Sequence, residues 1–228
     1  MMEGTGTKKV DHWMEKFLDV RKYRFEWSVG ILLIFHVVGI VGMLSPWKAW
    51  FLAWTPGILL LSTVLLLVNH KDWNPGFLLS MGVALVVGYG VEVAGVKTGV
   101  IFGEYGYGET LGAKLWGVPP VMGLIWMMLV YATGVTVQRW KLPMLAKVAL
   151  AAAMMTALDV VIEPVAIRLD FWHWALETPP LLNYLGWFVV SFVLHFVFQT
   201  AQFEKRNRLA GILLIVQLVF FGTLNLLL

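Results

Sequence analysis

Seven runs of about 20 mainly apolar residues constrain the fold of this chain more than any other feature of its sequence. A helix rises about 1.5 Å per residue, so it needs about 20 residues to cross the ~30 Å hydrocarbon layer of a membrane. We therefore predict an all-α, polytopic integral membrane protein with about seven transmembrane helices. The predicted spans are residues 27–44, 50–69, 76–96, 119–138, 143–165, 182–203 and 209–228.

The composition supports this class and excludes others. Hydrophobic residues make up 59% of the chain and charged residues 14%, against roughly 45–50% and about 25% in soluble domains. The absence of cysteine excludes a disulfide, a thiolate metal site and a cysteine nucleophile. A net charge of +3 does not indicate a nucleic-acid partner, because the basic residues lie beside the predicted spans. With no internal repeat or linker, residues 27–228 are expected to form one transmembrane domain.

The first 26 residues are too highly charged for a signal peptide. Their apolar residues follow helical spacing, with Lys and Arg between them. We expect residues 1–26 to form a cytoplasmic amphipathic segment that lies on the membrane surface. A partly disordered tail is the alternative.

The basic residues also predict the orientation, because Lys and Arg gather on the cytoplasmic side of membrane proteins. An inward N-terminus places 13 of the 17 Lys and Arg residues on that side. The four others, on the outer side, are Lys48, Lys97, Lys114 and Arg168. We therefore expect a multi-pass protein of the cell (cytoplasmic) membrane with its N-terminus inside. The two longest loops, residues 97–118 and 166–181, then share the outer side.

Three carboxyl groups lie inside the predicted spans, where a charged side chain costs roughly 2.5–3.5 kcal/mol by insertion scales. They are Glu92 in the third span and Asp159 and Glu163 in the fifth. Glu92 and Asp159 each lie about 24 Å beyond the inner end of a span that runs outward, so they are expected at one depth. Asp159 and Glu163 share a helix face. This clustering favours a catalytic site; helix-end acids that meet water or pair with Arg168 are the alternative.

The five histidines do not form a metal-binding pattern, since none lies three or four residues from another. No metal is therefore expected, and the acid-catalysed reaction considered below requires no other cofactor. His36 and His195 are expected to make hydrogen bonds between helices, and His195 lies too deep to join the acids. Gln217 and Asn225 are also interpreted as polar packing residues. The last span has no lysine for a retinal Schiff base, which excludes a retinal photoreceptor.

Four aromatic residues in the two long loops lie near the acids in this arrangement. They are Tyr105 and Tyr107 in the first loop and Trp172 and Trp174 in the second. Singly, each fits the aromatic belt found at membrane interfaces. Together, they are candidates to line a site for an apolar ligand.

Several motifs resemble those of the CruF-type carotenoid biosynthesis proteins. They are Val91–Gly99, Phe102–Tyr107, Leu111–Gly112, Gly117–Pro119, Ala157–Asp159 with Glu163–Pro164, the Trp172/Trp174 pair, and Pro180–Trp187. Members of this family include carotenoid 1',2'-hydratases and bisanhydrobacterioruberin hydratases. The resemblance implies a hydro-lyase that adds water to the terminal 1',2' double bond of an acyclic carotenoid and forms a tertiary alcohol. In this family an aspartate often stands at the position of Glu163.

The acid cluster and this reaction fit each other. Protonation of a trisubstituted alkene gives a tertiary cation, so we expect one acid among Glu92, Asp159 and Glu163 to donate to carbon and another to take a proton from water. Burial and a neighbouring carboxylate favour the protonated form of such a group. A ring face of Tyr105, Trp172 or Trp174 could steady the cation, and Tyr107 and Asn183 join these three as candidate substrate-binding residues. The expected partners are lipid-dissolved carotenoid, water, membrane lipids and other enzymes of carotenoid biosynthesis.

Two alternatives remain at this point. A carotenoid cyclase would use the same proton donor, but an internal double bond would capture the cation. A transporter or binding protein for a small polar solute would line a water-filled path with its acids. The clustering of the acids near one end of their spans disfavours such a path.

Overall fold

The computed structural model describes residues 23–228, which form eight α-helices, one 3-10 turn and two short strands. In chain order these are α2 (Arg24–Met43), α3 (Lys48–Ala53), α4 (Thr55–Val68), α5 (Pro75–Thr98), β1 (Tyr105–Tyr107), α6 (Val121–Thr136), η1 (Val137–Arg139), α7 (Met144–Arg168), β2 (Trp172–Trp174), α8 (Leu181–Thr200) and α9 (Arg208–Leu227). The all-α class predicted from the apolar runs is confirmed.

Six helices in the described part of the chain are long and apolar enough to cross a membrane: α2, α5, α6 with η1, α7, α8 and α9. The second predicted span, residues 50–69, is instead divided into α3 and α4 at Trp54. Pro56 explains the division, because it has no N–H to bond the carbonyl of Leu52 and its ring clashes with the preceding turn. Proline also favours the first turn of a helix, where α4 holds it. With 14 residues, α4 is about 21 Å long, shorter than the hydrocarbon layer.

Helix α6 forms the centre of the bundle, packed against α4, α5, α7, α8 and α9. Of its 16 residues, all except Leu124 and Ile125 are buried. A helix that is apolar on every side is expected in such a position. Two glycines permit the closest approaches, because a Cβ atom at Gly88 would overlap Trp126 and one at Gly134 would overlap Phe198.

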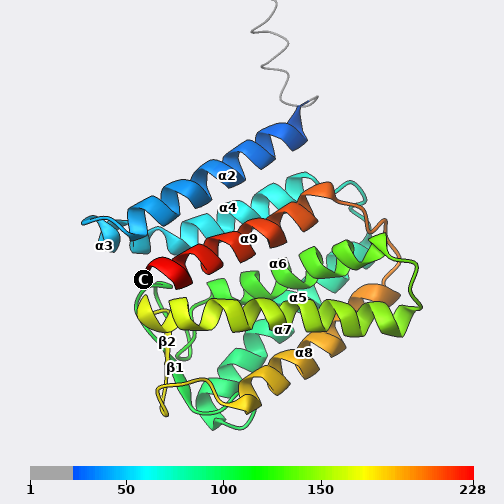
Figure 1. Cartoon of the computed structure of the whole chain (residues 1–228). Coiled ribbons are helices and arrows are strands. Elements are labelled where there is room, and N and C mark those ends of the chain that lie inside the picture. The colour runs from blue at the N-terminus through cyan, green and yellow to red at the C-terminus, as the bar shows by residue number, and fades with distance from the viewer. Residues whose placement is uncertain (1–22) are drawn as a thin grey trace, which may run out of the picture.

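The two long loops meet in a two-stranded antiparallel sheet at one end of the bundle (Figure 1). Tyr105 pairs with Trp174 and Tyr107 pairs with Trp172. Because successive side chains of a strand point to opposite faces, these four aromatic residues share one face of the sheet. His173 lies on the other face and is exposed.

The course of the chain agrees with the predicted placement of the loops. The sheet lies at the end of the bundle where α9 ends, and the start of α2 lies at the opposite end (Figure 1). Both long loops therefore lie at one end, as predicted from the sequence. The assignment of that end to the outer side of the membrane stays a prediction. Residues 1–22 of the predicted interfacial segment lie outside the described residues, and α2 already includes residues 24–26.

Candidate active site

The three membrane-embedded acids come together beneath the β1–β2 sheet. Glu92 of α5, Asp159 of α7 and Glu163 of α7 are 2%, 3% and 2% exposed. None of them forms an ion pair with Arg168 or any other described residue. The three acids are therefore neither exposed to water at helix ends nor paired with Arg168 in the described part of the chain.

Glu92 accepts three hydrogen bonds from neutral donors. The hydroxyl groups of Tyr105 and Tyr107 donate to its Oε2 atom over 2.6 and 2.7 Å, and Trp126 Nε1 donates to its Oε1 atom over 2.8 Å. Burial, followed by the nearby Glu92 carboxyl, raises the pKa of Tyr107 well above its ordinary value. Both phenols thus keep their protons at neutral pH and remain donors; burial raises the pKa of Tyr105 in the same way.

Glu163 is also held by three donors. Trp172 Nε1 and Trp174 Nε1 donate to its Oε2 atom over 3.1 and 3.0 Å. The side-chain amide of Asn183, in the first turn of α8, donates to Glu163 Oε1 over 3.2 Å and to Asp159 Oδ2 over 3.0 Å. Asn183 therefore links the two acids of α7. Each of the four loop aromatics therefore donates a hydrogen bond to a carboxyl group.

Asp159 differs from the other two acids in its surroundings. Its Oδ2 atom accepts the bond from Asn183, and no donor from residues 23–228 reaches its Oδ1 atom. It is also the one carboxyl among the described residues that lines a large apolar cavity of about 380 Å³. This cavity is lined by α2, α3, α4, α6, α7 and α9, together with Trp187 of α8 and residues of the two long loops. The arrangement leaves one carboxyl oxygen of Asp159 available to a group inside the cavity.

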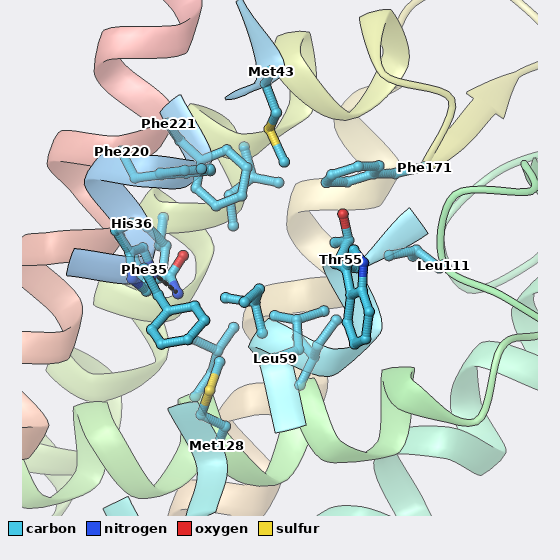
Figure 2. A pocket seen from close by; sticks show the side chains of 18 of the residues that line it. Phe35, His36, Met43, Thr55, Leu59, Leu111, Met128, Phe171, Phe220 and Phe221 are labelled. Carbon is cyan, nitrogen blue, oxygen red and sulfur yellow. Dashed lines mark hydrogen bonds between the residues drawn. The ribbon is translucent and has the colours of Figure 1, made fainter. Parts of the chain in front are cut away.

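The walls of this cavity are mostly aliphatic and aromatic. Figure 2 shows Phe220 and Phe221 of α9 with His36 on one side, and Phe171 and Leu111 of the loops on the other. Besides Asp159, its few polar side chains include Thr55, His36 and Gln217. Thr55 Oγ1 is buried and has no hydrogen-bond partner within the described chain. A largely apolar pocket with few polar groups is the usual form of a small-molecule site.

A second cavity of about 20 Å³ lies beside the first. Glu92, Glu163, Asn183 and the four loop aromatics line it, and Met122, Trp172 and Trp187 line both cavities. A space of about 10–15 Å³ with several polar partners can hold one water molecule. The two cavities therefore place a carboxyl at an apolar space and two further carboxyls at a space of the size of water.

The histidines occupy the packing positions expected from the sequence. His195 Nε2 hydrogen bonds to Thr133 Oγ1 of α6 over 2.7 Å. The amide of Gln217 donates to His36 Nε2 over 3.3 Å, and Asn225 donates to the carbonyl of Val161. The interhelical bonds predicted for His36 and His195 are confirmed, and Gln217 and Asn225 are polar residues that pack between helices. Within residues 23–228 no group of three or more His, Asp and Glu side chains is arranged to hold a metal ion.

Two tryptophans of the site were not singled out from the sequence. Trp126 donates to Glu92, and its ring stacks on Trp187 with 4.3 Å between centroids. A signal for Trp126 was present, since it lies inside its predicted span rather than at a membrane interface, and a buried indole N–H needs a partner. Trp187 stood within a recognised motif, but nothing in the sequence placed it at the cavities.

Known proteins resemble this chain over most of its length. Residues 52–228 match a family model described as carotenoid biosynthesis protein. Over 204 residues the chain is 29% identical to bisanhydrobacterioruberin hydratase from Haloarcula japonica, and the match covers 78% of this chain and 68% of that protein. No solved structure was found to match.

Proposed function

This chain belongs to the carotenoid biosynthesis protein family, and from that premise we propose that it is a carotenoid hydratase, a hydro-lyase that adds water across the terminal 1',2' double bond of an acyclic end group. The name of the related hydratase supports the reaction class. The observation that carries the proposal is the placement of Asp159 at the apolar cavity, next to a water-sized space lined by Glu92 and Glu163.

In the proposed reaction, Asp159 is the acid. The carboxyl proton passes to C2', so that an O–H bond breaks, a C–H bond forms and the π electrons of the alkene are consumed. The positive charge remains on C1', which carries two methyl groups and forms a tertiary cation. Asp159 suits this role because fewer donors hold it than hold the other two acids, and because it reaches the apolar cavity.

Water completes the proposed reaction. A molecule in the small cavity forms a C–O bond to C1', and Glu163 or Glu92 takes one of its protons as general base. The product is a tertiary alcohol. The proton then held by the base equals the one that Asp159 gave, and its return restores the starting state without a cofactor. Trp172 and Trp187 line both cavities, and in the proposed reaction their rings steady the cation.

Pigment analysis tests this function directly. The protein is expressed in cells that accumulate lycopene, the pigments are extracted, and their molecular masses are measured by mass spectrometry. A hydratase product gains the mass of one or two water molecules, whereas a cyclase product keeps the mass of lycopene. A cyclised product would contradict the proposed hydration and support the cyclase alternative. Unchanged lycopene in the presence of inserted protein would count against both enzymes for this substrate.

A further inference from the structure

We infer that the large cavity admits one end of a long polyene sideways from the lipid. The opening is framed by Phe35 and Val38 of α2, by Trp50 of α3 and by Trp54 at the end of α3. The identity of the polyene rests on the proposed function. The position of the opening rests on the exposure of the cavity walls.

The walls of the cavity are unequally exposed. Phe35, Val38, Trp50 and Trp54 all line it, and they are 43%, 48%, 60% and 55% exposed. On α6, α7 and the β2 loop, the lining residues Leu129, Leu158 and Phe171 are at most 5% exposed. The cavity is therefore closed toward the centre of the bundle and open between α2 and the α3–α4 segment.

This opening faces lipid rather than water. Helix α2 is a candidate membrane span, and Phe35 and Val38 lie well inside it. Their neighbours on the outer surface of the helix are large apolar side chains. Ile34, Val37 and Val41 are 62%, 59% and 64% exposed. A surface of this composition at this depth is suited to the acyl chains of lipids.

The division between α3 and α4 produces the opening. A continuous helix in the predicted second span would lie along α2, whereas the break at Trp54 turns α3 out of line with α4 (Figure 1). Helix α3 still contacts α2 closely at one point, where the Phe51 ring leaves no room for a side chain at Gly42. The indole rings of Trp50 and Trp54 are left at the edge of the cavity.

The size of the cavity determines how much of a polyene can enter. Its volume of about 380 Å³ is at the lower end of the roughly 300–1,000 Å³ range of pockets that enclose drug-sized ligands. A carotenoid is a longer molecule, so only its reacting end fits. The rest of the polyene then passes between Val38 and the two tryptophans and lies along the membrane-facing surface of the protein.

Two adjacent valines provide a matched test. Val37 and Val38 are both exposed on α2, but only Val38 lines the cavity. Val38→Trp should fill the opening, and Val37→Trp should add the same side chain to the lipid-facing surface. Each variant is purified in detergent from pigment-accumulating cells, and retained pigment and hydrated product are measured per inserted protein. We expect Val38→Trp to lower both by roughly tenfold or more and Val37→Trp to leave them near wild type.

A second measurement guards against a Val38→Trp variant that fails to insert. Because the chain has no cysteine, Val38→Cys and Val37→Cys each introduce the single thiol of the protein. Bound pigment should slow the reaction of a membrane-permeant maleimide with Val38→Cys and leave that of Val37→Cys unchanged. Equal protection, or equal pigment retention by the two tryptophan variants, would overturn the lipid-side entrance. Pigment that is retained at the entrance but never hydrated would overturn the proposed function instead.

Discussion

Tyr105 and Trp174 face each other across the β1–β2 sheet, with 5.1 Å between their ring centroids, yet they bind different carboxyl groups. Tyr105 donates to Glu92 of α5, and Trp174 donates to Glu163 of α7. The sheet therefore ties together two acids that lie on separate helices. It also covers them, and each of the two carboxyl groups is only 2% exposed.

The first prediction concerns this aromatic cap. Trp174→Phe keeps a ring against Tyr105 and removes the N–H group that donates to Glu163. Loss of a donor to a buried acceptor costs about 1–3 kcal/mol, so we expect a lower thermal midpoint in detergent and a lower hydration rate. Trp116→Phe is the matched control, because Trp116 is 63% exposed in the neighbouring loop. Equal stability and rate in the two variants would show that the bond to Glu163 is dispensable.

The second prediction concerns the origin of the added oxygen. In the proposed mechanism, oxygen enters from a water molecule in the small cavity, so the reaction needs no dioxygen. Membranes that contain the protein are incubated with substrate under anaerobic conditions in water labelled with heavy oxygen. The hydroxylated product should carry the label in full. A requirement for dioxygen, or label that comes from it, would rule out the proposed hydration.

Much of this architecture could be predicted from the sequence, because the membrane imposes it. A segment that crosses a bilayer must be long and apolar, and the acids at Glu92, Asp159 and Glu163 stood out within such segments. The rise of a helix alone predicts that Glu92 and Asp159 lie at one depth. Interhelical bonds by His195 and His36 followed from the same reasoning.

The remaining features depend on contacts between distant parts of the chain. The pairing of Tyr105 with Trp174 joins residues whose loops are separated by two helices, and a three-residue strand carries too little pattern to predict. The division between α3 and α4 at Trp54 was not predicted because residues 50–69 are mainly apolar, although Pro56 was a local signal for it. Glu163 lies one turn closer than Asp159 to the end of its predicted span, yet it is buried and hydrogen bonded to Trp172 and Trp174.

The third prediction concerns topology. The loop that contains Lys114 and the loop that contains Lys205 lie at opposite ends of the bundle, separated by α6, α7 and α8. Reporter fusions after Lys114 and after Lys205 should therefore report opposite sides of the membrane, with Lys114 outside by the distribution of basic residues. Reports from the same side would mean that one of the three intervening helices does not cross the membrane.

The fourth prediction concerns the three acids. Asp159→Asn keeps an oxygen that can accept the bond from Asn183, and Glu92→Gln keeps one that can accept the bond from Trp126. Both variants should therefore insert and fold while they lose a carboxyl that can exchange a proton. General acid–base groups contribute about 10²–10⁴-fold to a rate, so we expect hydration per inserted protein to fall by that order. We expect hydration by Glu163→Gln to fall by a similar factor, because Glu163 is buried and lines the same small cavity as Glu92.

The deep histidine provides the control for this series. His195 is fully buried and hydrogen bonded to Thr133, away from both cavities, so His195→Gln changes a buried polar group without touching the acids. It should retain much more activity per inserted protein than the acid variants, although the lost bond can lower stability by about 1–3 kcal/mol. Insertion is checked by gel filtration in detergent before rates are compared. Near-wild-type hydration by both Asp159→Asn and Glu92→Gln would show that the acids are structural and that the proton donor lies elsewhere.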